Sequence, residues 1–255
     1  MLPRPFVRFD ALQKRYGKGP LVLDSLDLSV REGEFVSLIG PSGCGKSTLL
    51  KLLAGLSPVS AGDLVIDGMK PVDAREEMFY VFQEANLLPW SRVLENVELP
   101  LRIRGDARDR RRERAREMVE LVGLKEAERQ FPWQLSGGMR MRVSIARALS
   151  VRPKILLLDE PFGALDEMTR DGLNEDLLEI RERDPFTAFF VTHSVAEAVF
   201  LSTRIVVLSA NPGRIADVIE VPFAFPRKAE LRESPEYLEV LAVATRALRD
   251  VISES

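Results

Sequence analysis

Residues 40–47 read Gly40-Pro41-Ser42-Gly43-Cys44-Gly45-Lys46-Ser47. An apolar run precedes this stretch at residues 35–39, and a run of helix-forming residues begins at Thr48. The order of strand, glycine-rich loop and helix is typical of a loop that holds the phosphates of a nucleoside triphosphate. Glycines allow backbone N–H groups to approach a polyphosphate closely, and the N-terminus of the following helix adds partial positive charge. The sequence therefore predicts a nucleotide site between a buried strand and a helix.

Two side chains of this phosphate loop (residues 40–47) have specific predicted roles. The Lys46 ammonium can reach the terminal phosphates, and the Ser47 hydroxyl can complete the coordination shell of a Mg²⁺ ion. The chain has no Asn-Lys-x-Asp motif of the kind that binds guanine, which favours ATP over GTP. The residues predicted to contact the nucleotide here are Gly40, Pro41, Ser42, Gly43, Cys44, Gly45, Lys46, Ser47 and Thr48.

The composition limits what the chain can be. Its 255 residues suffice for one large domain or two small ones with an ample core. The formal net charge of -3 argues against nucleic acid as the main partner, because nucleic-acid-binding proteins usually carry a basic excess. Cys44 is the only cysteine, so no intrachain disulfide can form. The N-terminus does not resemble a secretory leader, and no apolar run approaches the roughly 18 residues needed to span a bilayer. We therefore expect any membrane role to come through a partner.

Strand-like and helix-like segments alternate along the chain, which indicates an α/β fold with a parallel sheet covered on both faces. The first two strand-like segments alternate between apolar and polar residues, as half-exposed antiparallel strands do. Residues 94–149 are rich in helix, and we interpret them as an insertion into the α/β core. Ser234-Pro235-Glu236 predicts the start of a final amphipathic helix. The predicted strands are residues 6–9, 22–30, 35–39, 63–67, 79–82, 155–158, 188–192 and 205–208.

A second chemical centre follows the apolar strand at residues 155–158, which ends in Asp159 and Glu160. Ligands of parallel sheets collect at the carboxyl ends of the strands, so both carboxylates are expected beside the phosphate loop. Asp159 suits the Mg²⁺ shell, directly or through water, and Glu160 suits a general base that polarises the attacking water. The alternative is an ordinary strand end before a turn at Pro161. The phosphate loop upstream favours the catalytic interpretation.

A third motif, Leu135-Ser136-Gly137-Gly138-Met139, is another glycine-rich turn that opens a helix. Its N–H groups, serine hydroxyl and positive helix end again suit a phosphate. One triphosphate does not need two such cradles in a single small fold, so we infer that this turn serves the nucleotide of another subunit. A simple helix N-cap at Ser136 is the alternative that the segment alone leaves open.

With these three motifs in order, the chain resembles an ABC-transporter ATPase subunit up to about residue 225. The resemblance implies a single domain with the P-loop NTPase (RecA-like) fold, in which an antiparallel β subdomain and a helical subdomain accompany the core sheet. We expect the core at about residues 1–86 and 151–225. The helical subdomain is expected at about residues 87–150, and the C-terminal helix at about residues 234–252.

The resemblance also implies roles for residues outside the phosphate loop. Gln83 is placed like the glutamine that senses Mg²⁺ and contacts the membrane subunit, and His193 like the switch histidine that contacts the γ-phosphate. Tyr16 is placed like the aromatic residue that stacks on adenine. Asp166 ends the segment at residues 163–166, which looks like the loop joining the two subunits' sites. Residues 135–139 look like the family's signature motif, although Met139 stands where glutamine is usual.

The implied assembly is a head-to-tail homodimer, or pseudo-symmetric pair, that traps two ATP molecules. Glu160, His193 and Gln83 would act in hydrolysis, and closure would move transmembrane permease subunits. A periplasmic or lipid-anchored solute-binding protein would supply the solute, which places this chain at the cytoplasmic face of a bacterial inner membrane. Residues 86–90 and 207–215 look like the nitrate/sulfonate/taurine/bicarbonate importer subfamily. For the first segment, a local loop anchored by Trp90 is the alternative.

Two other functions compete with the transporter ATPase. A soluble ABC-type ATPase acting on DNA or ribosomes would carry a long coiled-coil insertion or two such units, and this chain shows neither. A module that binds ATP without turnover would lack the general base, yet Glu160 is present. The charge run at residues 108–114 suggests nucleic acid, but its interleaved acidic residues favour a solvated helix face.

Overall fold

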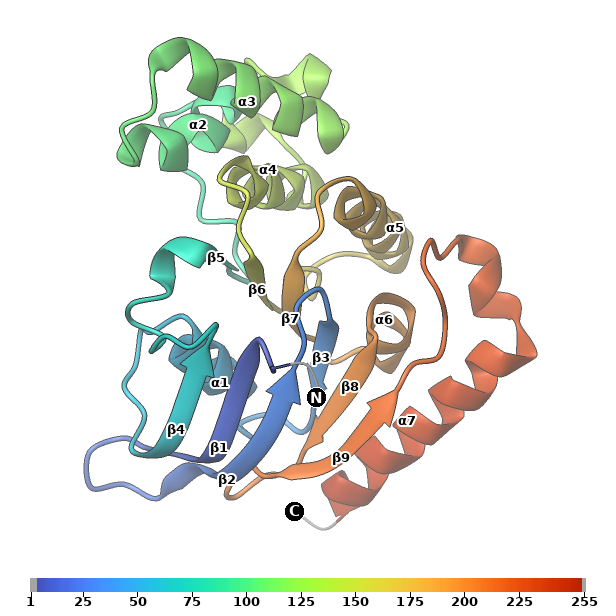
Figure 1. The fold of residues 1–255 in the computed structure, drawn as a ribbon. Helices are drawn as coiled ribbons and strands as arrows, with labels where there is room; N and C mark the ends of the chain where they lie inside the picture. The colour runs from blue at the N-terminus through green and yellow to red at the C-terminus, as the bar shows by residue number, and fades with distance from the viewer. Residues whose placement is uncertain (1–3, 254–255) are drawn as a thin grey trace.

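The computed structural model describes residues 4–253, so the first three residues of the predicted core and the last two residues of the chain lie outside it. A six-stranded sheet forms the centre, a three-stranded sheet lies on one side of it, and a lobe of helices stands above (Figure 1). Within residues 4–253, no helix combines the length and the low polarity needed to cross a membrane.

The elements follow the predicted alternation of strands and helices. The strands are β1 (Val7–Arg15), β2 (Leu21–Val30), β3 (Phe35–Ile39), β4 (Ala61–Ile66), β5 (Met78–Val81), β6 (Ile155–Asp159), β7 (Thr187–Val191), β8 (Arg204–Leu208) and β9 (Ile215–Glu220). The helices are α1 (Lys46–Leu53), α2 (Val93–Ile103), α3 (Arg108–Leu121), α4 (Gly137–Ser150), α5 (Glu167–Arg183), α6 (Val195–Leu201) and α7 (Pro235–Ser253). Short 3₁₀ turns lie at Arg75–Glu77, Lys125–Ala127, Pro132–Gln134 and Ala229–Glu233.

The central sheet has the strand order β5-β6-β7-β3-β8-β9. The first five strands are parallel, as predicted, but the edge strand β9 runs antiparallel to β8. The reason is the short turn at residues 209–214, because a tight turn can join only antiparallel neighbours. The parallel pairing brings the carboxyl ends of β3, β6 and β7 to one edge of the sheet, where the motifs of the sequence follow each strand.

Each of the parallel strands of the central sheet buries side chains on both of its faces. In β3, Phe35 and Ile39 pack into the core formed with the helices, whereas Val36 and Leu38 pack against α1 and the small sheet. Continuous apolar runs are typical of strands covered on both sides. The small sheet, with order β2-β1-β4, is antiparallel, as the alternation in its first two strands predicts.

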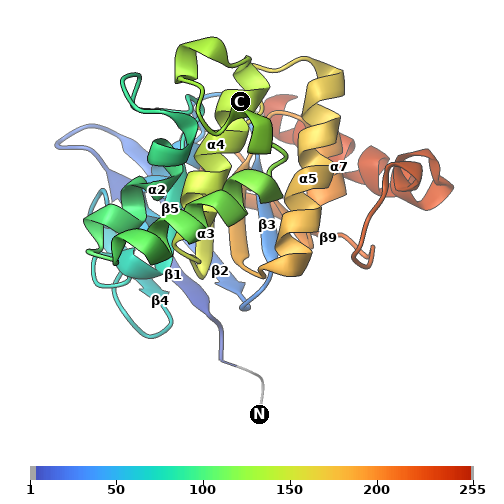
Figure 2. The same cartoon turned by 90° about the horizontal axis from the view of Figure 1, so that it is seen from above.

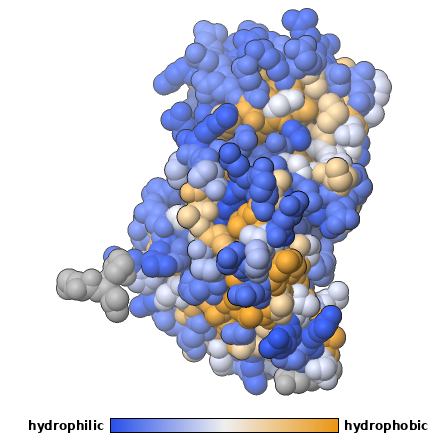
Figure 3. Space-filling view, turned by 90° about the vertical axis from the view of Figure 1, so that its right-hand side faces the viewer, coloured by the Kyte–Doolittle hydropathy of each residue, from blue (hydrophilic) through white to orange (hydrophobic). Residues whose placement is uncertain are grey.

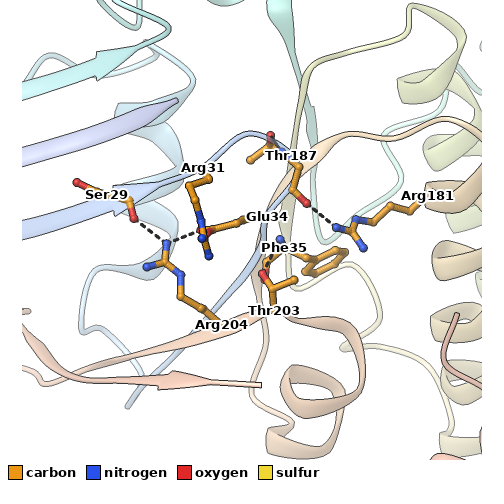
Figure 4. Close-up of polar contacts among 9 residues, drawn as sticks. Ser29, Arg31, Glu34, Phe35, Arg181, Thr187, Thr203 and Arg204 are labelled. Atoms are coloured by element: carbon orange, nitrogen blue, oxygen red, sulfur yellow. Dashed lines mark hydrogen bonds and ion pairs between the residues drawn. The ribbon is translucent and has the colours of Figure 1, made fainter. Parts of the chain in front are cut away.

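A polar junction fixes the amino end of β3, opposite the phosphate loop (Figure 4). Glu34 forms ion pairs with Arg31 and Arg204. Arg204 also donates a hydrogen bond to the Ser29 carbonyl at 2.7 Å, and the Phe35 N–H donates to Thr203 Oγ1 at 3.0 Å. These bonds tie the end of β2 and the starts of β3 and β8 together, so both sheets share one rigid anchor.

The helical lobe contains α2, α3 and α4 (Figure 1). The sequence predicts a solvated charged face at residues 108–114, but two of its arginines bond to neighbouring elements instead. Arg111 forms an ion pair with Glu98. Arg114 donates to the Leu149 carbonyl at 3.1 Å and pairs with Asp184 at 2.8 Å. These arginines therefore attach α3 to α2, α4 and the end of α5.

The C-terminal helix α7 begins where Ser234 predicts, since Ser234 Oγ accepts a hydrogen bond from the Tyr237 N–H at 3.2 Å. Seen from above, α4, α5 and α7 follow one another across the molecule (Figure 2). Helix α7 buries Tyr237, Ala244 and Val251. Its outward face includes the exposed Leu238, and Figure 3 shows hydrophobic and hydrophilic residues mixed on that side of the molecule.

Candidate active site

The phosphate loop joins β3 to the N-terminus of α1. Gly45 caps this helix with a φ of 103°, and a Cβ there would come within 2.5 Å of Leu23 Cδ2, so only glycine fits. The Lys46 side chain is buried inside the loop, where its Nζ donates to the carbonyls of Gly40 at 2.8 Å and Pro41 at 3.0 Å. The loop thus holds an ammonium group at the positive end of a helix, which is an arrangement suited to phosphate.

Asp159, at the end of β6, accepts two hydrogen bonds. Ser47 Oγ donates to Asp159 Oδ1 at 2.8 Å, and the Tyr80 hydroxyl donates to Asp159 Oδ2 at 2.7 Å. Burial, and then the hydrogen bond to Asp159, raise the pKa of the Tyr80 phenol, so this residue remains a donor. The adjacent hydroxyl and carboxylate oxygens are the hard donors that Mg²⁺ prefers, and the residues present fit this ion.

The sequence prediction of the site did not include Tyr80. The only signal for it was a hydroxyl-bearing residue within the apolar strand at residues 79–82. The contact itself depends on β5 pairing with β6, which places Tyr80 opposite Leu157, two residues before Asp159.

Glu160 and His193 meet at the ends of the neighbouring strands β6 and β7. Their Oε1 and Nε2 atoms lie 2.7 Å apart. Glu160 has a left-handed backbone with a φ of 50°, and its N–H donates to the Val191 carbonyl at 3.0 Å. Such a conformation costs a non-glycine residue on the order of 1 kcal/mol and is often found at functional sites. Here it accompanies the close approach of the Glu160 carboxylate to the imidazole.

A cavity of about 400 Å³ lies beside this pair. Gln83, which follows β5, lines the same cavity, so the structure brings together the three residues predicted to act in hydrolysis. The lining residues are Gln83, Glu160, Gly163, Arg170, Thr192, His193, Ser194 and Glu197.

The turn at residues 135–139 opens α4 on the helical lobe. Ser136 caps the helix, since its Oγ accepts from the Met139 N–H at 3.2 Å. A Cβ on Gly138 would lie 2.8 Å from Thr169, so this glycine allows α4 to approach α5 closely. Ser136 and Gly137 remain exposed. The N-cap alternative is therefore correct for the Ser136 side chain, and it leaves the surface of the turn free.

Asp166 and Tyr16 are two predicted site residues that do not line the cavity beside Glu160 and His193. Asp166 caps α5 by accepting from the Thr169 N–H at 3.0 Å, and this hydrogen bond lowers the pKa of the carboxyl. Tyr16 is exposed in the turn between β1 and β2, with the Lys14 Nζ 4.6 Å from its ring centroid. That turn leads into Leu23, the residue that packs against Gly45.

The loop at residues 84–92 is held by two buried side chains that the sequence prediction did not identify. Arg147 of α4 donates to the carbonyls of Asn86 at 2.8 Å and Ala85 at 2.9 Å. The Asn96 side chain accepts from the Leu88 N–H at 2.7 Å and donates to the loop's carbonyls. Trp90 is 73% exposed, which contradicts the alternative that it anchors the loop by packing.

Comparison with known proteins identifies the chain. Its sequence matches the family described as "ABC transporter" over residues 23–163, more than half of its length. The chain belongs to the ABC transporter family. A solved structure titled as a dimeric post-hydrolysis state of the ATP-binding cassette MJ0796, bound to ADP and Pi, is similar to this ABC chain. Its TM-score is 0.75 and its identity 35%, with 86% of this chain and 100% of that chain covered.

Named relatives of this ABC chain include import proteins. The taurine import ATP-binding protein TauB of Sinorhizobium fredii is 48% identical over 228 residues, which cover 88% of this chain and 85% of the relative. The nitrate import ATP-binding protein NrtD of Synechococcus elongatus is 42% identical over 242 residues, covering 92% and 88%. These relationships confirm the predicted P-loop NTPase fold and ATPase class of this ABC chain.

Proposed function

We propose that this chain is the ATP-hydrolysing subunit of an ABC importer and couples closure of an ATPase dimer to solute movement through permease subunits. The observation that carries the proposal is the convergence, at one sheet edge, of Lys46, the Ser47–Asp159 pair and the Glu160–His193 pair. These groups provide phosphate binding, metal ligation and water activation, which are the requirements of ATP hydrolysis.

In this proposal, backbone N–H groups of the phosphate loop and the Lys46 ammonium bind the phosphates of ATP, and Tyr16 stacks on the adenine. Ser47, Asp159 and Gln83 hold Mg²⁺, directly or through water. The ion, when bound, neutralises charge on the phosphate oxygens. Tyr80 orients the Asp159 carboxylate toward this task through its hydrogen bond.

Glu160 acts as the general base, accepting a proton from the water that attacks the terminal phosphorus. His193 contacts the γ-phosphate and fixes the Glu160 carboxylate through the Nε2–Oε1 contact of 2.7 Å. The adjacent cavity of about 400 Å³ gives the water access to both side chains.

The second subunit is proposed to be another copy, arranged head to tail. Its turn at Ser136, Gly137 and Gly138 faces the ATP held by the first copy, and Asp166 lies at the contact between the two sites. The exposure of Ser136 and Gly137 supports this arrangement, as does the dimeric cassette among similar structures. Nucleotide then drives closure because it binds the closed state much more tightly than the open one.

The permease is proposed to dock on the loop at residues 84–92, which we call the docking loop. Its bonds to Arg147 and Asn96 hold it in one shape, and the exposed Trp90 offers a large apolar contact. The chain would then work at the cytoplasmic face of a bacterial inner membrane, with a solute-binding protein on the other side. The names of the nitrate and taurine import relatives support a small solute of the nitrate/sulfonate/taurine/bicarbonate class.

Size-exclusion chromatography with light scattering on Glu160→Gln, with and without Mg²⁺-ATP, tests the proposal. We expect hydrolysis to fall by about 10²- to 10⁴-fold and the protein to shift from monomer to dimer only with Mg²⁺-ATP. Glu160→Gln combined with Ser136→Arg is the matched control and should remain monomeric. A Glu160→Gln protein that hydrolyses ATP at the wild-type rate, or that stays monomeric with ATP bound, would contradict the proposal.

A further inference from the structure

A buried polar cluster lies directly behind His193. At its centre is Glu197, which is only 6% exposed although its side chain is a carboxylate. Burial raises the pKa of this carboxyl, against the opposing effects of Thr192 and Arg170. A buried charge is costly unless neighbours compensate it. The positions of those neighbours therefore indicate what Glu197 does.

On one side, Glu197 holds the turn that carries His193. Thr192 Oγ1 donates to Glu197 Oε2 and accepts from the Ser194 N–H at 2.9 Å. Ser194 Oγ in turn accepts from the Glu197 N–H at 3.3 Å. The residues immediately before and after His193 are thus bound to each other and to Glu197, and this leaves only the imidazole free to meet Glu160.

On the other side, Glu197 faces Arg170 of α5. The Arg170 Nε and Glu197 Oε1 atoms are 3.8 Å apart, and neither has a hydrogen-bond partner among the described residues. The far end of the same guanidinium donates to the Leu165 carbonyl at 2.9 Å. Leu165 belongs to the loop at residues 163–166, which precedes α5. A single arginine therefore bridges this loop to the residue that holds the His193 turn.

We propose that Glu197 and Arg170 are positioning residues that transmit movement of the loop at residues 163–166 to His193. The proposal rests on the proposed function, in which the second subunit meets this loop at Asp166. A displacement of Leu165 would pull on Arg170, change its separation from Glu197 and shift the Thr192–Ser194 turn. His193 would then reach its position against Glu160 only when the loop is correctly placed.

Glu197→Gln tests this relay, because the amide keeps an oxygen for Thr192 but loses the charge opposite Arg170. We expect kcat to fall about tenfold while the affinity for ATP changes less than twofold, since misplaced catalytic groups lower rates steeply. Glu197→Ala, which loses both contacts, should lower kcat about a hundredfold. Glu175→Gln is the matched control: it weakens the α5 pair with Arg232, 2.8 Å long, which does not contact the His193 turn.

A spectroscopic measurement separates positioning from simple stabilisation. His193 is the only histidine, so its imidazole resonances need no assignment. They should shift in Glu197→Gln and not in Glu175→Gln. Asp166→Ala should also shift them, and this effect should disappear when it is combined with Glu197→Gln.

The proposed relay also predicts the effects on kcat of an Arg170 variant and of a double variant. Arg170→Lys, which keeps the charge but cannot bridge Leu165 and Glu197 together, should lower kcat, and it supplies the test if a Glu197 variant fails to fold. In the Glu197→Gln/Arg170→Lys double variant, the two losses should not multiply, because both act through one contact. Wild-type kcat in either single variant, multiplying losses, or resonances that move equally in Glu175→Gln would overturn the inference. Those outcomes are distinguishable from failure of the proposed function, which requires hydrolysis by the wild type and its loss in Glu160→Gln.

Discussion

At the scale of single residues, the site depends on contacts between residues far apart in the chain. The two oxygens of Asp159 accept from Ser47, 112 residues away, and from Tyr80, 79 residues away. The parallel strands of the central sheet make this possible, because their carboxyl ends lie along one side of the sheet. The Asp159 side chain is consequently aligned by residues that lie outside its own sequence motif.

Tyr80→Phe removes one hydrogen bond to Asp159 and little else. Since groups that orient metal ligands typically contribute tenfold or more in affinity, we expect the Mg²⁺ concentration for half-maximal hydrolysis to rise about tenfold. Titrating ATPase activity with Mg²⁺ measures this change. Tyr16→Phe, which keeps an aromatic ring at the proposed adenine contact, is the control and should leave the Mg²⁺ requirement unaltered. An unchanged requirement in Tyr80→Phe would show that Asp159 needs no such support.

Cys44 gives the stability a specific dependence on pH. Burial raises the pKa of its thiol above the ordinary value of 9.0, against the opposing charge of Lys46. When the pH rises above this ordinary pKa, the thiol of the unfolded chain loses its proton while the native thiol retains it. The free energy of unfolding therefore falls as the pH rises. Compared with Cys44→Ala, the wild type should lose about 1 kcal/mol between pH 7 and pH 10. Urea denaturation of both proteins measures the difference, and parallel pH curves would contradict the prediction.

At the scale of elements, strands and motifs differ in how well the sequence predicts them. The apolar runs of β3, β6 and β7 are bounded by polar or glycine residues, and the structure confirms them to within a residue or so at each end. Strand β9 escaped prediction because it lies at an edge and buries only Ile219, so it lacks a clear apolar pattern. The antiparallel direction of β9 likewise follows from its turn rather than from its own residues.

The residues that carry the proposed chemistry were easier to find in the sequence than the residues that support them. Glycine loops and strand-end carboxylates reveal themselves locally, and the structure places Lys46, Ser47, Asp159 and Glu160 as one group. The residues that align this group and the docking loop are a partly buried tyrosine, a buried arginine and a buried asparagine. Their roles arise from tertiary contacts, which no spacing in the sequence encodes.

Asn96 is the support whose removal should affect the docking loop most. Its amide serves residues 88–92 as both donor and acceptor, and Asn96→Leu would remove the hydrogen-bond partner of the Leu88 N–H and of the Ser91 carbonyl. We expect a loss of about 3 kcal/mol in the free energy of unfolding. Glu95→Gln, one residue earlier, keeps an oxygen for its bond from the Arg92 N–H and should change stability little. Urea denaturation compares the two, and equal stabilities would contradict the assigned role.

At the scale of the whole molecule, the phosphate loop and the turn at Ser136 lie on different lobes, so a head-to-tail dimer would contain two composite sites. In the Glu160→Gln background, neither Lys46→Ala nor Ser136→Arg should trap ATP alone. A mixed dimer of the two combines both defects in one site and leaves the other intact. Mixing should therefore restore one trapped ATP per mixed dimer, measured with labelled nucleotide after gel filtration. If the mixture traps no more ATP than either variant alone, the two sites are not shared between subunits.

The positions of the two tryptophans have a further consequence. Trp90 is 73% exposed in the docking loop, and Trp133 is 72% exposed three residues before Ser136, where its ring stacks on Phe131. The central sheet contains none. The native chain therefore carries an intrinsic fluorophore at each surface where it is proposed to meet another protein, while its catalytic core emits no tryptophan light. Replacing Trp133 by phenylalanine would leave Trp90 as an intrinsic reporter of permease binding. Replacing Trp90 by phenylalanine would leave Trp133 as an intrinsic reporter of contact with the partner subunit.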